Sequence, residues 1–289
     1  MRICIIADDI SPYSKKRFLK ESLISKHDLS FVSWKCLAFN GEDNTLTTDK
    51  HMLLEDFDAV ILRSSADAIT PLHLVVEYCK NKKICLLNSA LYARLNYTNK
   101  LNQQVIFRAY NIPCLETLYG EKLTFTTIKK EFGLPFVAKI AIGSHGKQVF
   151  KIHSSQEFSR FIKDRAQDHK LYLFQKYHEI PGDYRVFIVG QEVFGAVKRV
   201  APKGEWRTNV RGSLHERVEG EKRVIALAQS IGKKLGIDFA GIDILIDSSG
   251  KARVIEINTT AQFHVFEKVF PEINIVKKTL AFLEKKSSR

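Results

Sequence analysis

The fold of this chain is decided between residues 241 and 258, where the sequence reads Gly241-Ile242-Asp243-Ile244-Leu245-Ile246-Asp247-Ser248-Ser249-Gly250-Lys251-Ala252-Arg253-Val254-Ile255-Glu256-Ile257-Asn258. Two apolar, β-branched runs flank a short polar stretch, a pattern typical of a β-hairpin. With Ser249 and Gly250 as the two loop residues, continued antiparallel pairing sets Asp243 opposite Glu256. Opposed residues share a face of the sheet, and Asn258, two residues beyond Glu256, points to that face as well.

Three oxygen-bearing side chains therefore converge on one face of the hairpin. The other face is predicted to carry the apolar residues Ile242, Ile244, Ile255 and Ile257. Two carboxylates and an amide suit Mg²⁺, above all when substrate phosphates complete the coordination. Because opposed carboxylates repel, something cationic is expected between them. A solvated polar face of an ordinary hairpin is the alternative interpretation of Asp243, Glu256 and Asn258.

Two basic sets accompany the hairpin. Lys139 ends an apolar stretch, and the small-residue turn Gly143-Ser144-His145-Gly146 follows it. Backbone N–H groups in such a turn can approach phosphate oxygens, and the lysine adds a point charge. The second set is Lys198, Arg199, Lys203, Arg207, Arg211 and Arg217. Taken singly, these could be an ordinary turn, a solvent-exposed loop or a nucleic-acid surface.

Together with the hairpin, the basic sets indicate a site for a nucleoside triphosphate and phosphoryl transfer. A Walker A motif and the kinase signatures are absent from the sequence, and no GxGxxG follows the first predicted strand. The sequence therefore favours neither a P-loop fold, a protein kinase nor a Rossmann dinucleotide site.

Length, charge and cysteine content further restrict the class of protein to which this chain can belong. The 289 residues carry a formal charge of +13, which points to acidic partners such as phosphates, nucleic acid or an anionic membrane. Residues 1–94 are nearly neutral, whereas residues 95–289 carry a net +12. Five scattered cysteines without a CxxC motif argue against a disulfide framework or a zinc site. No apolar run approaches the roughly 18 residues of a membrane span, so we expect a cytoplasmic protein.

The first third of the chain alternates strand and helix patterns, which predicts a parallel sheet. Strands are expected at residues 2–7, 29–34, 58–63 and 84–87, helices at 15–25 and 71–81, and a loop at 40–50. The helix over 15–25 is predicted to bury Phe18, Leu19, Leu23 and Ile24.

From about residue 95 the pattern becomes mixed and hairpin-rich. Helices are expected at residues 98–110, 155–165 and 223–235, with strands at 135–140, 148–152, 171–175, 184–189, 193–200, 241–246 and 253–258. The helix over 98–110 carries the apolar stripe Leu101, Val105 and Ile106, and the helix over 223–235 should end at Gly236. The late lysines Lys277, Lys278, Lys285 and Lys286 are expected to be solvated, with a fraying C-terminal tail.

The order of these motifs resembles the ATP-grasp superfamily and, within it, the RimK-like carboxylate–amine ligases. The resemblance covers essentially the whole chain and rests on six segments. They are Thr98-Asn99-Lys100-Leu101, Pro135-Phe136-Val137-Ala138-Lys139 with the glycine loop, Phe174-Gln175-Lys176-Tyr177, Gly182-Asp183-Tyr184-Arg185, Lys198-Arg199 with Trp206-Arg207-Thr208-Asn209, and Asp243 with Glu256 and Asn258.

This resemblance implies an α/β (α+β) ATP-grasp fold. An N-terminal parallel α/β domain over residues 1–94 would precede two mixed α+β subdomains, 95–175 and 176–289, that clamp ATP. The resemblance also implies a set of nucleotide-binding residues: Lys100, Lys139, Gly143, Ser144, Gly146, Gln175, Lys176, Tyr177, Asp183, Arg185 and Asn209. Within it, Asp183 would face the ribose and Arg185 the substrate.

The metal, Mg²⁺ or Mn²⁺, would be held by Asp243, Glu256 and Asn258. Lys139, Arg199 and Arg207 are the catalytic candidates that would neutralise the developing phosphoryl charge.

The implied activity is an ATP- and Mg²⁺-dependent ligase that forms an amide through an acyl-phosphate. The expected substrates are a carboxylate acceptor, which is a peptide, a protein or a small molecule, and an amino acid such as glutamate. After Glu256-x-Asn258 the chain continues Thr259-Thr260-Ala261-Gln262-Phe263 instead of the usual S-x-G, which leaves the acceptor open.

Two alternatives remain: a ligase of another ATP-grasp branch, glutathione-synthetase-like or amino-acid-carrier, and a non-catalytic nucleotide or nucleic-acid binding module. Nucleic acid and membrane are disfavoured as partners, and a homo-oligomer is compatible with the sequence.

Overall fold

The fold is described here from a computed structural model, which covers residues 1–8, 10–48, 52–63, 69–94, 99–141, 149–165 and 171–288. Within these ranges the chain forms three larger sheets and one small hairpin. The predicted α/β (α+β) fold, with a parallel N-terminal sheet followed by hairpin-rich α+β parts, is confirmed, and the sheets of these later parts are antiparallel. No described helix has the length and apolar character that crossing a membrane requires.

The N-terminal sheet is parallel, as the alternation of strands and helices predicts. Its strands run in the order β2-β1-β5-β6, with bounds β1 (Arg2–Ile6), β2 (Asp28–Val32), β5 (Ala59–Leu62) and β6 (Cys85–Leu86). Helices α1 (Pro12–Ser25), α2 (Ile69–Asn81) and α3 (Ser89–Tyr92) and the 3₁₀ turns η1 (Trp34–Cys36) and η2 (Leu54–Asp56) connect them. The expected loop at 40–50 was wrong in part, because β3 (Ala38–Asn40) and β4 (Thr45–Thr47) pair there as a hairpin.

Helix α1 turns a different face inward from the predicted one. Of the predicted apolar stripe, only Phe18 is buried, while Leu19, Leu23 and Ile24 are exposed. The buried face instead contains Glu21, which accepts hydrogen bonds from Arg17 and from Asn274. These polar partners lie both on the helix and some 250 residues away, so the helix can bury a carboxylate without leaving it unpaired.

The central segment forms an antiparallel sheet in the order β7-β10-β8-β9. Its elements are α4 (Lys100–Ala109), β7 (Thr117–Leu118), α5 (Phe125–Phe132), β8 (Phe136–Ile140), β9 (Val149–Ile152), α6 (Ser155–Arg165) and β10 (Tyr172–Lys176). Helices α5 and α6 cover it with a core rich in phenylalanine. The stripe predicted for α4 was wrong at Val105, which is exposed, whereas Gln103 is buried and exchanges two hydrogen bonds with the backbone of Ile257.

The C-terminal segment builds a five-stranded antiparallel sheet in the order β13-β12-β11-β14-β15. Its elements are β11 (Asp183–Val189), β12 (Glu192–Val200), β13 (Leu214–Val218), α7 (Lys222–Leu235), β14 (Phe239–Ile246), β15 (Ala252–Asn258), α8 (His264–Val269) and α9 (Ile275–Ser287). Helix α7 ends at Gly236 in the left-handed conformation, as predicted, and buries its apolar face on one side of the sheet.

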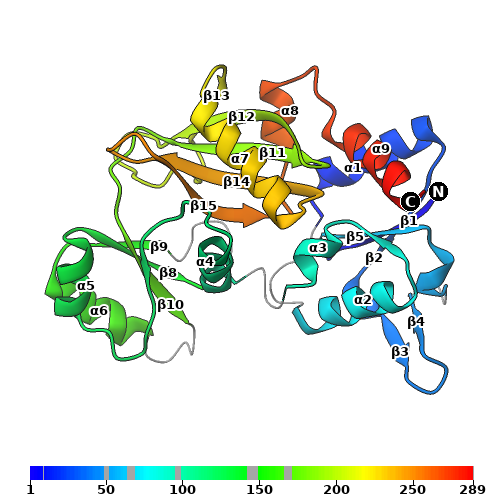
Figure 1. Cartoon of the computed structure of the whole chain (residues 1–289), viewed down its shortest axis with the longest axis horizontal. Helices are drawn as coiled ribbons and strands as arrows, with labels where there is room; N and C mark the ends of the chain where they lie inside the picture. Colours follow the sequence, from blue (N-terminus) through cyan, green and yellow to red (C-terminus); the bar gives the residue numbers. More distant parts are fainter. Residues whose placement is uncertain are drawn as a thin grey trace.

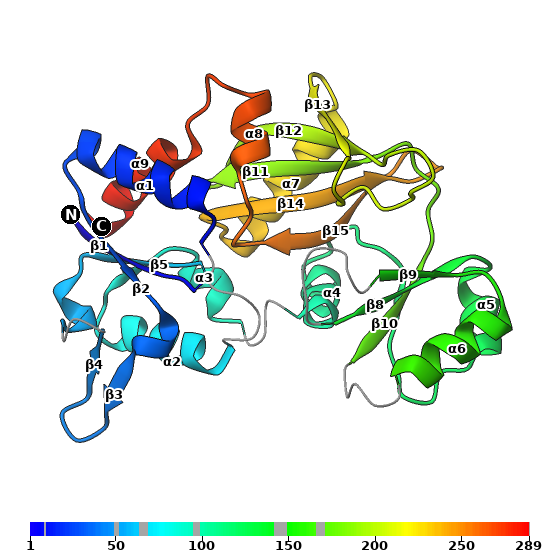
Figure 2. The ribbon, with the colours of Figure 1, turned by 180° about the vertical axis from the view of Figure 1, so that it is seen from behind.

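The N-terminal and central parts lie side by side below the five-stranded sheet of the C-terminal part (Figure 1, and from behind in Figure 2). Helix α8 packs on the five-stranded sheet, α9 returns to the N-terminal sheet, and both share a core with β1, β5 and α1. The predicted domain boundaries at 94/95 and 175/176 stay predictions. Packing crosses the first of them, and the second falls within strand β10.

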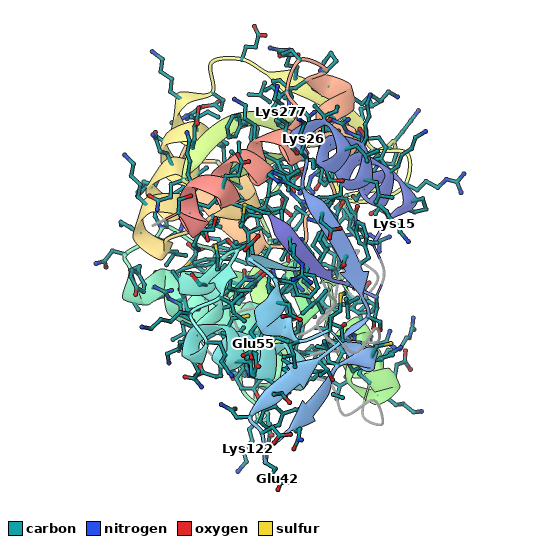
Figure 3. The ribbon with its side chains drawn as sticks, turned by 90° about the vertical axis from the view of Figure 1, so that its right-hand side faces the viewer. Lys15, Lys26, Glu42, Glu55, Lys122 and Lys277 are labelled. Atoms are coloured by element: carbon teal, nitrogen blue, oxygen red, sulfur yellow. The ribbon has the colours of Figure 1, made fainter. Side chains whose placement is uncertain are left out.

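The late lysines divide into exposed and anchored ones. Lys277 lies at the surface (Figure 3), as expected for solvated charge. The expectation was wrong for Lys286, whose Nζ donates to the carbonyl of Leu86 at 2.9 Å and pairs with Asp238. The tail predicted to fray, from Glu284 onward, is thus the last turn of helix α9 as far as Ser287, and Lys286 ties it to the N-terminal sheet.

Candidate active site

A cavity of about 780 Å³ lies between the central sheet and the five-stranded sheet. Strands β8, β9 and β10 line one side, and β12, β14, β15 and residues 200–209 line the other. It gathers the following predicted site residues: Lys100, Lys139, Gln175, Lys176, Tyr177, Asp183, Arg199, Arg207, Asn209, Asp243 and Glu256. Arg185 and Asn258 do not line it, and the predicted glycine-loop residues Gly143, Ser144 and Gly146 lie outside the described residues.

The hairpin of β14 and β15 brings Asp243 opposite Glu256, as the sequence predicts. The route to this pairing differs from the expected one. The backbone N–H of Asp247 donates to Lys251, so the loop holds three residues and not two. An irregularity between Asp243 and Ile244 then restores the register, because the strand pairs Val254 with Ile244 and Glu256 with Asp243 and leaves Ile255 over.

This β-bulge also corrects the predicted orientation of Ile255. The regular alternation would turn Ile255 toward the apolar core, beside Ile257, and would turn Val254 toward the cavity. In the structure Val254 and Ile257 are buried in that core, while Ile255 lines the cavity next to Glu256. The cavity wall therefore carries an apolar and an acidic side chain in succession.

Asp243 is buried between two arginines. The Arg185 guanidinium donates to both carboxylate oxygens, with Nη2 at 2.8 Å from Oδ2, and Arg199 Nη2 lies 3.2 Å from Oδ2. Burial favours the neutral carboxyl group, but the two guanidinium groups outweigh it and hold the pKa of Asp243 below its usual range. Arg199 also pairs with Asp183, its Nε 2.8 Å from Oδ1. Of the cations expected beside the acidic pair, those next to Asp243 are arginines.

The Arg185 side chain is held in place by Gly241. A Cβ atom added at Gly241 would lie 2.8 Å from Arg185 Cδ and 2.7 Å from the Cβ of Ala261. Only glycine leaves room for the arginine to cross the strand and reach Asp243. Although Arg185 does not line the cavity, it therefore fixes a carboxylate that does.

Two lysines face the acidic pair from the central part. Lys139, on β8, is buried, and burial lowers its pKa to about 8 although Glu256 acts in the opposite direction. Lys100 opens α4, and its Nζ lies 3.8 Å from Glu256 Oε2. Two lysines of the central part therefore face the two carboxylates of the five-stranded sheet across the cavity.

The other end of the cavity is aromatic and apolar. Lys151 Nζ lies over the ring of Tyr177 at 4.3 Å and over that of Trp206 at 5.6 Å, and the two rings meet edge to face. Gln175 is buried and donates to the hydroxyl of Thr117 at 2.8 Å. Sequence reasoning missed Lys151, but the pairing of β8 and β9 puts it opposite Val137 on the face that also holds Lys139.

The basic set between residues 198 and 217 divides between two faces. Arg199 enters the cavity, whereas Lys198, one residue before it, pairs with Glu216 across β12 and β13. Arg207 lines the cavity, and Glu205 accepts from its Nε at 3.0 Å and its Nη2 at 2.6 Å. The hydrogen bonds from Arg207 hold the pKa of Glu205 at about 2, so this pair stays ionised over the physiological range.

The comparisons with known proteins agree with this geometry. The profile of the RimK-like ATP-grasp domain family matches residues 101–283. A probable alpha-L-glutamate ligase of Legionella pneumophila is 28% identical over 99% of this chain and 96% of its own length. A probable alpha-L-glutamate ligase of Mannheimia succiniciproducens is 30% identical over 81% of this chain and 79% of its own length.

Solved ATP-grasp structures share the fold. A RimK domain ATP-grasp protein of Sphaerobacter thermophilus has a TM-score of 0.74 at 15% identity, covering 98% of this chain and 100% of that one. The ATP-grasp ligase PsnB, solved with minimal precursor, Mg and ADP, has a TM-score of 0.72 at 18% identity, covering 99% of this chain and 97% of that one. With the cavity between its two ATP-grasp-like sheets, this chain belongs to the RimK-like ATP-grasp family of ATP-dependent carboxylate–amine ligases.

Proposed function

We propose that this protein joins an amino acid such as glutamate to a carboxylate acceptor, which is a peptide, a protein or a small molecule, through an acyl-phosphate. The observation that carries the proposal is the cavity between the two sheets. It sets Lys100 and Lys139 of the central part against Asp243 and Glu256 of the five-stranded sheet. A nucleoside triphosphate needs both cations for its phosphates and carboxylates for its metal.

Each end of the cavity would take a different part of ATP. The aromatic end, with Tyr177 and the buried Gln175, would hold adenine together with Lys176. Asp183 would face the ribose, and Lys100 and Lys139 the phosphates, with Asn209 at the rim. The glycine loop with Gly143, Ser144 and Gly146 would cover the phosphates. Segments 95–175 and 176–289 would thus clamp the nucleotide between them.

The acidic pair fits a hard divalent cation. Asp243 and Glu256 lie directly opposite each other, and both point into the cavity. Asn258 follows on the same strand, paired with Gly241, and would complete the protein ligands. When bound, Mg²⁺ or Mn²⁺ would neutralise phosphate charge and orient the β- and γ-phosphates.

The chemistry asked of the side chains is positioning and charge neutralisation. A carboxylate oxygen of the acceptor attacks the γ-phosphorus, the new O–P bond forms, and ADP leaves as the bond to the β-phosphate oxygen breaks. Lys139, Arg199 and Arg207 would neutralise the charge that develops on the transferred group. The amine then attacks the acyl carbon, inorganic phosphate leaves and the amine gives up a proton.

The substrate class is supported by the relatives. The two curated relatives described above are named probable alpha-L-glutamate ligases, and the ATP-grasp ligase PsnB has been solved in complex with minimal precursor. The net +12 of residues 95–289 suits an acidic acceptor. A homo-oligomer is compatible with this proposal and is not required by it.

The proposal is tested by incubating the full chain with ATP, MgCl₂, the twenty amino acids in pools and a library of acidic peptides. We expect one pool to release inorganic phosphate in step with ADP, and mass spectrometry to find one amide per phosphate. Glu256→Gln should abolish the release, while Lys122→Gln, an exposed lysine on the outside of the central part (Figure 3), should leave it unchanged. If ATP binds and no pool releases phosphate, the protein is a nucleotide-binding module and not a ligase.

A further inference from the structure

A buried arginine lies where the N-terminal sheet meets the loop after β15. Arg63 directly follows β5, the third strand of the parallel sheet β2-β1-β5-β6, and only 6% of it is exposed. Its Nη2 donates to the carbonyl oxygens of Thr260 and Ala261, at 3.2 and 3.1 Å. Ligands of open parallel sheets bind beyond the carboxyl ends of the strands, which is the end where this side chain lies.

The charge of Arg63 is not compensated by any residue that the structure describes. Its hydrogen-bond acceptors are neutral carbonyl groups, and its Cζ atom lies over the rings of Phe239 and Phe263, 5.5 and 5.7 Å from their centroids. Burial lowers the pKa of Arg63 to about 10, since no carboxylate offsets it. Buried charges in proteins are normally paired, because an isolated one costs free energy.

Arg63 differs from Arg199 in the charge of its partners. Both guanidinium groups are almost fully buried, but Arg199 lies between the carboxylates of Asp183 and Asp243. Of the donors on Arg63, only Nη2 has an acceptor among the described residues, so Nε and Nη1 offer N–H groups to a further acceptor. A guanidinium fork of this kind matches the two oxygens of a carboxylate.

The position of Arg63 connects it to the reaction site. Ala261, whose carbonyl it binds, packs against Gly241, and Gly241 lies under the side chain of Arg185, the partner of Asp243. Arg63 thus lies beyond the end of β15, past Asn258, on the side of the acidic pair opposite the aromatic end. Figure 2 shows this end of β15 directed toward the N-terminal sheet. The segment 259–263 that Arg63 holds is also the one that departs from the family pattern.

We propose that Arg63 binds a carboxylate group of the substrate, of the amino acid or of the acceptor, at the junction between the N-terminal sheet and segment 259–263. This inference rests on the proposed ligase function, which it deepens by naming a residue that selects for substrate charge. Arg63 does not line the cavity that would hold the nucleotide, so the two functions can be tested apart.

Binding is tested by thermal unfolding of the full chain with L-glutamate, L-aspartate, glutarate or an acidic peptide, each compared with its amide. In the wild-type protein we expect at least one carboxylate, and not its amide, to raise the unfolding temperature in a concentration-dependent way. Arg63→Gln should weaken that effect about 10- to 100-fold in ligand concentration, as expected for a lost charge-assisted pair, and leave the effect of ATP unchanged. Arg63→Lys should restore part of the affinity, because it retains the charge without the fork. Whether the active ligand is the free amino acid or the peptide identifies the source of the carboxylate.

A purely structural role for Arg63 predicts a different result. Arg17, which pairs with Glu21 and Glu267, is the matched control, and Arg17→Gln should lower the unfolding temperature without changing carboxylate binding. If the Arg63 variants fail to fold, or if carboxylates stabilise them as well as the wild type, Arg63 is a structural tie and the proposal is overturned. The proposal is also overturned if no carboxylate raises the unfolding temperature of the wild-type protein although the phosphate-release assay shows turnover with one of these carboxylates. Carboxylate binding through Arg63 without any phosphate release would instead contradict the ligase function alone.

When turnover is measurable, Arg63→Gln should raise the KM of one substrate about 10- to 100-fold and leave the KM for ATP unchanged. A fall in kcat with every KM unchanged would count against a binding role.

Discussion

The two sheets that face each other across the cavity carry charge in different ways. On the five-stranded sheet, the cations and anions pair with one another, as Arg185 and Arg199 do with Asp183 and Asp243. On the central sheet, Lys139 is equally buried but forms no ion pair with any described residue. Ion pairs therefore stabilise the cavity wall formed by the five-stranded sheet. On the wall formed by the central sheet, Lys139 stays available to pair with a ligand. Stability and activity should therefore respond differently to changes in the two walls.

The largest effect is expected from Arg199→Met. This change leaves Asp183 buried without its partner and removes one of the two partners of Asp243, and breaking a buried pair on one side costs about 3–5 kcal/mol. We expect both the free energy of unfolding and ligase activity to fall, as measured by urea denaturation and phosphate release. An Arg199→Met protein as stable as the wild type would show that the wall does not depend on these pairs.

The matching change on the other wall is Lys139→Met. Removal of a preorganised charge should lower kcat/KM about 10²- to 10³-fold. Because the lysine is buried without a partner, an apolar side chain of similar length should leave the protein as stable or more stable. Activity and stability would then move apart, and the exposed lysine variant Lys122→Met should change neither.

The pH dependence of stability sharpens this contrast. The pKa of Lys139 is about 8 in the folded protein and 10.5 when unperturbed, so between these values the unfolded chain binds more protons. The destabilisation by Lys139 is thus full below about pH 8 and disappears as the pH rises toward 10.5. In protein freed of metal and nucleotide, the difference in unfolding free energy between wild type and Lys139→Met should shrink over this window. A difference that stays constant from pH 7 to 10.5 would contradict the lowered pKa.

A smaller effect is expected from Gly241→Ala. The new methyl group would crowd Arg185 and Ala261, and overpacking of this kind costs about 1–3 kcal/mol. Displacement of Arg185 should also lower kcat, since Asp243 loses its bidentate partner. Gly41→Ala, where the added Cβ would meet only the ring of Phe39 at 3.7 Å, is the control. Equal effects of the two substitutions would refute the role given to Gly241.

The smallest effect concerns the aromatic end. Trp206→Leu removes one of the two rings near Lys151, an interaction worth about 0.5–1 kcal/mol at partly exposed sites. We expect a two- to fivefold weaker affinity for ADP in calorimetry, with unchanged unfolding. Loss of all ADP binding would mean that Trp206 contacts the nucleotide directly.

The sequence predicts the fold and the opposition of Asp243 and Glu256, but part of that success is fortuitous. A two-residue loop without a bulge and a three-residue loop with one bulge produce the same pair. Local sequence cannot distinguish them, because Val254 and Ile255 are both apolar and suit either face of a strand.

The predicted faces of α1 and α4 were wrong for a related reason. Glu21 and Gln103 are buried because Asn274 and the backbone of Ile257 satisfy them, and such distant partners leave no mark on local periodicity. The sequence does not predict a binding role for Arg63 either. A single arginine after a strand becomes a candidate only when segment 259–263 is seen to fold against it.

The bulge at Ile255 has a consequence for how this site can change. In a regular strand only every second residue reaches the ligand, so an acid is always separated from the next contact by a core residue. Because the bulge adds one residue, two adjacent residues of β15, the apolar Ile255 and the acidic Glu256, both reach the cavity. Removing Ile255 would return the strand to strict alternation while Glu256 still met Asp243. The acidic pair and the apolar lining are thus separable by a single residue, and the shape of the pocket can drift in evolution without disturbing the carboxylates on which the chemistry depends.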